Sequence, residues 1–170
     1  MIERPKPEYR SGIGTDIHEL VVGRKLVLCG LDIPHSSGLA GHSDGDAGLH
    51  AIIDALLGAA AMGDIGTFFP DNDPKWKDID SKNLLLAVKN MLDEKDWEIA
   101  NIDIIIHAAV PRMEPYKAQM KRTIASILGI DFNVVNVKAK TDNGFGDAGA
   151  GDAIAATAIT LLKQRYRRTL

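Results

Sequence analysis

The sequence predicts an α+β protein in which a mixed four-stranded sheet packs against helices. Strand-like and helix-like segments alternate along the chain, and one strand-like segment is apolar enough to be buried within such a sheet. No linker, repeat or low-complexity tract divides the 170 residues, a length that fits one domain and buries a sizeable core. We therefore expect a single layered domain over residues 1–170, with residues 1–10 as a polar N-terminal extension.

Four segments are expected to be strands: residues 11–16, 25–28, 99–108 and 134–141. The first of them mixes small and β-branched residues, and the β-branched ones favour extended backbone. Residues 102–106 are apolar apart from Asp103, which is typical of a strand covered on both faces.

Four segments are expected to be helices: residues 46–62, 81–95, 115–128 and 150–167. In the first helix, apolar side chains recur at helical spacing from Leu49 to Ala60. Ser81 is expected to cap the second helix, Pro115 to open the third and Gly129 to end it. The cationic residues 163–168 would suit the last turn of the fourth helix, because they complement the helix dipole.

Composition excludes several classes of partner. The chain is 45% hydrophobic and 25% charged with a net charge of −3, and it has no basic stripe for nucleic acid. Its longest apolar stretch, residues 55–63, is too short to span a membrane, and the start has no apolar signal core. Cys29 is the single cysteine, so no internal disulfide forms and a reducing compartment is indicated. We expect a cytoplasmic protein without nucleic-acid or membrane partners.

Two histidine–carboxylate clusters near the N-terminus indicate a metal site. On a strand, Asp16 and His18 point to the same face, because side chains alternate between faces. His50 lies on the helix that follows the second cluster, which runs from His42 to His50. A strand that offers Asp and His, packed on a helix that offers His, supplies three ligands and leaves a fourth position open. That arrangement is usual for catalytic zinc.

Asp46 and Asp54 are each four residues from His50 and share its helix face. Either could hold the distal nitrogen of His50 and fix its tautomer. Other interpretations stay open at this point. Ser43-x-x-Asp46 resembles a capping box, Asp54 could be a solvated or salt-bridged acid, and an isolated histidine is more often a satisfied core residue than a ligand.

The motifs around these residues resemble a known family. The runs from Gly14 to His18 and from Ala40 to His50 are similar to those of 2-C-methyl-D-erythritol 2,4-cyclodiphosphate synthases. The similarity continues through residues 54–66, 69–73, 111–113 and 136–141, so that it spans about residues 11 to 163.

The resemblance implies a lyase of the non-mevalonate isoprenoid pathway. Members convert 4-diphosphocytidyl-2-C-methyl-D-erythritol 2-phosphate into the cyclic diphosphate and release CMP, by attack of the 2-phosphate on the β-phosphate. It implies Zn²⁺ or another divalent transition metal as a Lewis acid on Asp16, His18 and His50, and Mg²⁺ or Mn²⁺ bridging the substrate phosphates. It also implies a homotrimer with sites between subunits.

Residue roles follow from the same resemblance. His42 would lie beside the reacting phosphate and Thr141 would stabilise the transition state, which makes these two the catalytic residues. The residues implied to contact the substrate are Asp16, Ile17, His18, His42, Ser43, Asp64, Ile65, Gly66, Phe69, Pro70, Asp71, Asn72, Asp73, Ala108, Ala109, Val110, Pro111, Arg112, Met113, Glu114, Lys140, Thr141, Asp142 and Asn143. Residues 64–66 and 69–73 would hold the erythritol part, and residues 108–113 the cytosine. Without the resemblance, residues 69–73 would simply indicate an acidic turn.

The last loop departs from the family pattern. Asn143 stands where members have a glutamate that helps to bind the second metal ion, and neighbouring Asp142 could reach that ion instead. Ala150 stands where some members have an arginine that lines a central cavity for a terpenoid diphosphate, so we expect no such binding. Two other functions stay open: a metal-dependent phosphoesterase and a non-catalytic metal- or nucleotide-binding protein.

Overall fold

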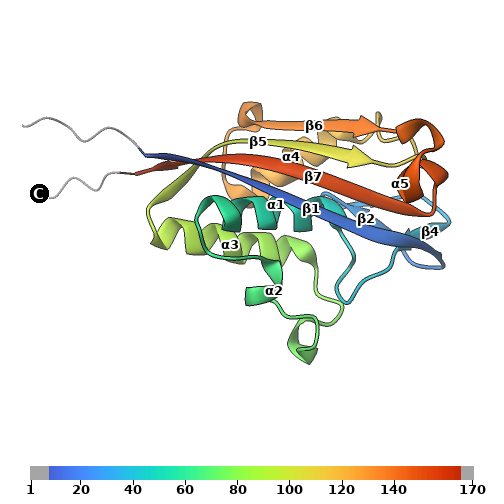
Figure 1. Cartoon of the computed structure of the whole chain (residues 1–170), viewed down its shortest axis with the longest axis horizontal. Helices are drawn as coiled ribbons and strands as arrows, with labels where there is room; N and C mark the ends of the chain where they lie inside the picture. Colours follow the sequence, from blue (N-terminus) through green and yellow to red (C-terminus); the bar gives the residue numbers. More distant parts are fainter. Residues whose placement is uncertain (1–7, 166–170) are drawn as a thin grey trace, which may run out of the picture.

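The computed structural model describes residues 8–165, which form an α+β fold with helices covering one face of a mixed sheet (Figure 1). The main sheet has five strands in the order β4-β1-β7-β5-β6. Their bounds are β1 Tyr9–Val22, β4 Ser37–Leu39, β5 Trp97–His107, β6 Val135–Lys140 and β7 Ala153–Gln164. Only β5 and β6 run parallel, and the other neighbours are antiparallel.

The predicted α+β class is confirmed, but the predicted number of strands is wrong, because the main sheet has five strands rather than four. The predicted strand over residues 25–28 forms β2 (Leu26–Leu28), which pairs only with β3 (Leu31–Ile33) in a separate two-stranded sheet. Two strands that the sequence did not indicate, β4 and β7, complete the main sheet.

Three helices make the covering layer. They are α1 Ala47–Ala59, α3 Ser81–Glu94 and α4 Lys117–Leu128. All three were expected, with small differences at their ends. The N-cap of α3 is Asp80 rather than Ser81, and α4 begins after Pro115, whereas Gly129 ends α4 in a left-handed conformation as predicted. The remaining helical segments are short: α2 Ile65–Phe68, α5 Gly146–Ala150, η1 Pro74–Trp76, η2 Phe132–Val134 and η3 Asp142–Gly144.

The helix predicted over residues 150–167 is wrong, because residues 153–164 form the central strand β7. Alanine is abundant there and favours helices, and apolar side chains stand on both sides of the segment, so no alternation marks a strand. Pairing with β1 and β5 on its two edges decides the structure. Lys163 and Gln164 therefore belong to a strand, and residues 166–168 of the predicted cationic helix end lie outside the described residues.

The N-terminal extension was expected to end at residue 10, but β1 already begins at Tyr9. Residues 1–7 lie outside the described residues.

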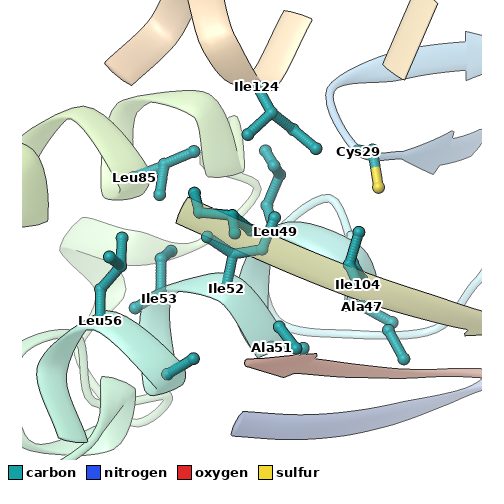
Figure 2. Packing of buried hydrophobic residues seen from close by; sticks show 14 of the residues in the cluster. Cys29, Ala47, Leu49, Ala51, Ile52, Ile53, Leu56, Leu85, Ile104 and Ile124 are labelled. Atoms are coloured by element: carbon teal, nitrogen blue, oxygen red, sulfur yellow. The ribbon is translucent and has the colours of Figure 1, made fainter. Parts of the chain in front are cut away.

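The core lies between the sheet and the helices (Figure 2). Helix α1 supplies fully buried side chains along most of its length, among them Leu49, Ile52 and Leu56. They pack against side chains of α3, α4 and β5, such as Leu85, Ile124 and Ile104. Because α1 is buried on nearly every side, its polar residues are the ones that need a specific explanation.

Strand β1 and helix α1 approach each other unusually closely. A Cβ atom added to Gly12 would lie 2.1 Å from the carbonyl oxygen of Ala55, and one added to Gly14 would lie 2.2 Å from that of Ala51. Glycine is therefore required at both strand positions, and alanine faces them from the helix. This close packing brings side chains of β1 within reach of side chains of α1.

Candidate active site

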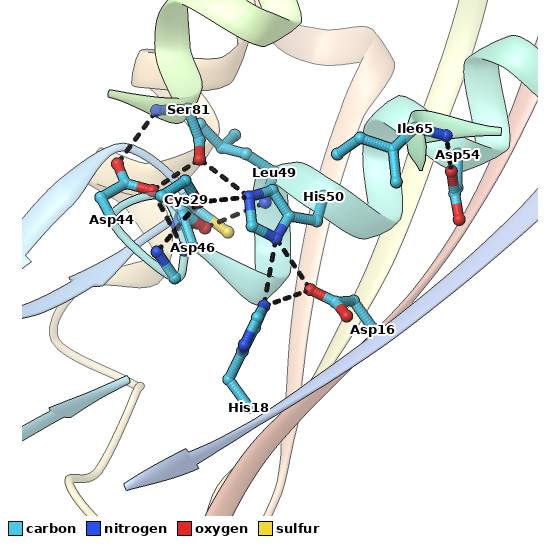
Figure 3. Close-up of polar contacts among 12 residues, drawn as sticks. Asp16, His18, Cys29, Asp44, Asp46, Leu49, His50, Asp54, Ile65 and Ser81 are labelled. Carbon is cyan, nitrogen blue, oxygen red and sulfur yellow. Dashed lines mark hydrogen bonds and ion pairs between the residues drawn. The ribbon is translucent and has the colours of Figure 1, made fainter. Parts of the chain in front are cut away.

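Asp16, His18 and His50 converge at the junction of β1 and α1 (Figure 3). The Asp16 carboxylate lies 2.9 Å from Nδ1 of His50 and 2.8 Å from Nε2 of His18. Those two ring nitrogens lie 3.2 Å apart, and the three ligand atoms all lie within 4.8 Å of one another. One carboxylate oxygen and two imidazole nitrogens are suitable ligands for Zn²⁺ and similar divalent ions. The sequence prediction of this trio is thus consistent with the geometry.

The charge balance at the trio also suits a cation. Burial alone would raise the pKa of the Asp16 carboxyl, but hydrogen bonds and charge from His18 and His50 outweigh it and lower the pKa from 3.8 to about 2. Burial would lower the pKa of the His50 imidazole, but the hydrogen bond and negative charge of Asp16 raise it. Asp16 is therefore ionised at neutral pH and available as an anionic ligand.

The distal nitrogen of His50 contacts serines rather than either predicted carboxylate. Nε2 of His50 lies 2.9 Å from Oγ of Ser81 and 3.2 Å from Oγ of Ser43. The prediction that Asp46 or Asp54 holds this nitrogen is therefore wrong. The sequence offered little signal for Ser81, because it is 31 residues away along the chain and begins a different helix.

Asp46 is the N-cap of α1, the alternative that the capping motif suggested, although the cap is Asp46 itself rather than Ser43. Its fully buried carboxylate accepts hydrogen bonds from the backbone N–H groups of Cys29, Gly30 and Leu49. Burial nevertheless raises the pKa of this carboxyl. Asp46 therefore ties the turn between β2 and β3 to the start of the helix that carries His50.

Asp54 holds a different part of the site. Its carboxylate accepts a hydrogen bond of 2.7 Å from the backbone N–H of Ile65, at the start of α2, and burial raises its pKa. Asp64 caps α2 and accepts hydrogen bonds from the hydroxyl and N–H of Thr67, which lower the pKa of Asp64. These two acids fix the loop on which Ile65 and Gly66 lie.

A cavity of about 540 Å³ opens beside the trio, within the range of small-molecule sites. The predicted site residues that line it are Asp16, His18, His42, Ser43, His50, Asp54, Ile65, Gly66, Phe69, Pro70, Asp71 and Asn72. Sequence reasoning missed Thr15, Gly41, Trp76, Ile79 and Leu84, which complete its wall. Phe69 and Trp76 meet edge to face with their ring centroids 5.1 Å apart, and Lys75 lies over the Trp76 ring.

Three predicted contact residues near this cavity do not line it. Ile17 is exposed on the opposite face of β1, Asp64 is exposed at the start of α2, and Asp73 caps η1 through the N–H of Lys75.

The remaining predicted residues form a second cluster at the ends of β5 and β6. Its members are Ala108, Ala109, Val110, Pro111, Arg112, Met113, Glu114, Lys140, Thr141, Asp142 and Asn143. The N–H of Ala108 bonds the carbonyl of Lys140, and the N–H of Ala109 bonds that of Ala148, so the two loops lie side by side. None of these residues lines the cavity at the trio. A single chain therefore brings the predicted site together in two separate halves.

In the second cluster, the Asp142 carboxylate is held by Nδ1 of His107 at 2.9 and 3.0 Å. Asp142 and Asn143 both have positive φ, and Asn143 is exposed. The hydroxyl of Thr141 donates to Oδ1 of Asn143 at 3.4 Å. The sequence did not single out His107, whose only signal was its place at the end of a predicted strand.

These features define a class of α+β proteins in which one Asp and two His side chains that could hold a divalent metal lie on the wall of a ligand-sized cavity. The YgbB family model matches residues 9–163 of the chain. The chain therefore belongs to the YgbB family.

Several named proteins are similar to the chain over most of its length. A 2-C-methyl-D-erythritol 2,4-cyclodiphosphate synthase of Alkaliphilus metalliredigens is 54% identical over 91% of this chain and 98% of its own length. The IspF of Plasmodium falciparum, solved as a CDP complex, superposes with a TM-score of 0.82 at 34% identity and covers 93% and 97% of the two chains. The bifunctional IspDF of Campylobacter jejuni gives a TM-score of 0.91 at 38% identity; the match covers 95% of this chain but 44% of that longer protein.

The resemblance seen in the sequence is thus confirmed, and so is the prediction that the chain is an enzyme, a lyase. Within residues 8–165, no helix has the length and apolar character needed to cross a membrane.

Proposed function

We propose that the chain converts 4-diphosphocytidyl-2-C-methyl-D-erythritol 2-phosphate into 2-C-methyl-D-erythritol 2,4-cyclodiphosphate and CMP, in the non-mevalonate isoprenoid pathway. The observation that carries the proposal is the convergence of Asp16, His18 and His50 on the wall of the cavity. The names of the relatives and the CDP complex of the Plasmodium falciparum structure support it.

In this reaction an oxygen of the 2-phosphate forms a bond to the β-phosphorus, and the bond from that phosphorus to the CMP oxygen breaks. Such a transfer depends on alignment and on neutralising charge, and folding both phosphates into one site makes the attack intramolecular. A divalent metal held by Asp16, His18 and His50 would supply Lewis-acid polarisation of the β-phosphate.

The chain's own residues would position the substrate. His42 and Ser43 line the cavity next to the trio, where they would contact the reacting phosphate. The loop fixed by Asp54, with Ile65 and Gly66, would hold the erythritol part. Phe69 and Trp76 give that end of the cavity an apolar wall.

We also propose that the enzyme is a homotrimer, because one face of the sheet is apolar and uncovered. Ile13, Ile17 and Ile159 are 65%, 54% and 51% exposed there, and soluble monomers rarely expose contiguous apolar patches of this kind. The register places Ile17 level with Ala155 and His107, so the second cluster borders this same face. Assembly through the face would let the second cluster of one subunit complete the cavity of the next. Sedimentation analysis is expected to give a trimer, and a monomer would contradict this.

Turnover assays test the function. Purified protein with the cytidyl substrate, zinc and magnesium should give the cyclic diphosphate and CMP in equal amounts. An uncyclised phosphate product would instead indicate a phosphoesterase. No turnover despite bound zinc would indicate a non-catalytic binding protein. A cytoplasmic location is part of the same proposal.

A second divalent ion, Mg²⁺ or Mn²⁺, is proposed to bridge the substrate phosphates with help from Asp142. We expect Asp142→Ala to raise the magnesium concentration needed for half-maximal turnover by about tenfold, because the loop loses a carboxylate that His107 holds in place. Asp147→Ala, which removes an exposed acid of the neighbouring helix α5, is the matched control and should leave this value unchanged. An unchanged magnesium dependence in Asp142→Ala would show that Asp142 is not used.

A further inference from the structure

We propose that Ser81 and Asp44 are positioning residues that orient His50 and fix its tautomer for metal binding. The inference rests on the metal site proposed above and goes beyond it, because neither residue is a metal ligand or lines the cavity. Figure 3 shows that both lie on the side of His50 away from Asp16 and His18.

The direction of the hydrogen bonds determines the tautomer. Ser81 Oγ lies 2.5 Å from Oδ1 of Asp44 and donates its single proton to that carboxylate. Its oxygen can then only accept from Nε2 of His50, which lies 2.9 Å away. Nε2 therefore carries a proton, so that with a metal bound it is Nδ1, on the side of Asp16, whose lone pair would bind the ion.

Asp44 holds Ser81 rigidly. Its second oxygen, Oδ2, accepts the backbone N–H of Ser81 at 3.0 Å. One carboxylate therefore binds both the hydroxyl and the N–H of Ser81 at the start of α3. Asp44 is itself fixed, since its N–H bonds the carbonyl of Ile79 and its Oδ1 accepts the N–H of Asp46. Ser81 is fully buried, which excludes water as a substitute partner for the His50 nitrogen.

Ser43 provides a weaker contact to the same nitrogen. Its Oγ lies 3.2 Å from Nε2 of His50 and already accepts the N–H of Gly45, and among residues 8–165 it has no hydrogen bond to a carboxylate. Ser43 also lines the cavity, where the substrate would compete for its hydroxyl. The contact through Ser81 is shorter, and the Asp44 carboxylate holds Ser81 in place. Ser81 therefore determines the orientation of the His50 ring.

The arrangement also connects two parts of the site. The segment between η1 and α3 is joined to the loop that precedes α1. The N–H of Asp78 donates a hydrogen bond to the carbonyl of His42. Ser81 comes three residues after Asp78, so the segment that carries Phe69 and Trp76 ends next to the residue whose hydroxyl contacts His50.

The variant Ser81→Ala isolates the hydroxyl group. The cap of α3 stays intact, because Asp80 still accepts the N–H of Lys82 and Asp44 still accepts the backbone N–H of residue 81. Thr160→Val is the matched control: Thr160 is equally buried, and its hydroxyl bonds the carbonyl of Ala55, away from His50. The measured quantity is the zinc dissociation constant of the purified protein, from competition with a chromogenic chelator.

We expect Ser81→Ala to weaken zinc binding by about 10- to 100-fold, as is typical when a partner of a metal-binding histidine is removed. Thr160→Val should bind zinc as the wild type does. Asp44→Asn should also weaken zinc binding, since an amide cannot accept both hydrogen bonds from residue 81. A melting curve of each metal-free variant shows whether it is folded.

Nitrogen NMR of the imidazoles in the zinc-loaded wild type tests the same idea without any substitution. The proposal requires that Nε2 of His50 is protonated and that Nδ1 is bound to the metal. A proton on Nδ1, or a folded Ser81→Ala with wild-type zinc affinity, would overturn the role of Ser81. A wild-type protein that binds no zinc would instead overturn the metal site itself, so the two failures are distinguishable.

Discussion

His50→Ala is expected to abolish stoichiometric zinc binding and to reduce turnover by about three orders of magnitude or more. Two ligands, Asp16 and His18, would remain, and both come from the same strand. A Lewis-acid metal contributes several kcal/mol to the transition state, and each 1.4 kcal/mol corresponds to about a tenfold change in rate. Elemental analysis of the purified variant and turnover assays measure the two effects.

The fold should tolerate this change. The ring of His50 contacts polar groups of Asp16, His18 and Ser81, whereas the apolar side chains of α1 that build the core are untouched. Alanine also has the highest helix propensity, and circular dichroism should be close to that of the wild type.

His35→Ala is the matched control for His50→Ala. His35 lies between β3 and β4, where Nδ1 contacts only the backbone of Ser37, and it does not line the cavity. We expect this variant to keep both zinc and turnover. Full zinc occupancy in His50→Ala would rule out His50 as a ligand.

Gly14→Ala is expected to destabilise the protein by about 3 kcal/mol or more. The added Cβ would lie 2.2 Å from the carbonyl oxygen of Ala51 and 2.6 Å from the backbone nitrogen of Ala55. Overpacking typically costs about 1–3 kcal/mol and more when, as here, backbone must move rather than a flexible side chain. The free energy of unfolding from urea titration measures the effect. Because Asp16 follows two residues later, zinc binding by any folded fraction should weaken as well.

Gly58→Ala, on helix α1, serves as the control for Gly14→Ala on strand β1. Gly58 is exposed on α1, and the nearest atom to an added Cβ is the carbonyl oxygen of Ile13 at 4.0 Å. Here alanine should stabilise the helix by roughly 0.5–1 kcal/mol. If Gly14→Ala were as stable as the wild type, the close packing of β1 on α1 would not be what positions the trio.

Local patterns in the sequence were sufficient to place a side chain where its position depends on a single helix or strand. The spacing of Asp16 and His18 placed them on one face of a strand, and helical periodicity placed His50 on α1. Each of these depends on backbone geometry alone. Strand β7 could not be found in this way, because its alanine-rich, evenly apolar sequence carries no alternation and its structure comes from pairing on both edges.

The hydrogen-bond partners of His50, a candidate metal ligand, likewise could not be found from spacing along one element. Asp46 and Asp54 were expected beside His50 because helical spacing puts them on its face, but a shared face does not fix where a carboxylate bonds. Asp46 instead binds the backbone of another turn, and Asp54 binds that of α2. The partner of His50 is Ser81, which comes from the start of α3.

The sequence by itself therefore determined which residues are candidate metal ligands, their order along the chain and the family that the chain resembles. The tertiary structure decided which groups meet: glycines in β1 allow α1 to approach, and Asp44 brings Ser81 to the distal nitrogen of His50. The physical reason is that hydrogen bonds and close packing between distant segments depend on how elements are placed relative to one another. Spacing along one element carries no information about that placement.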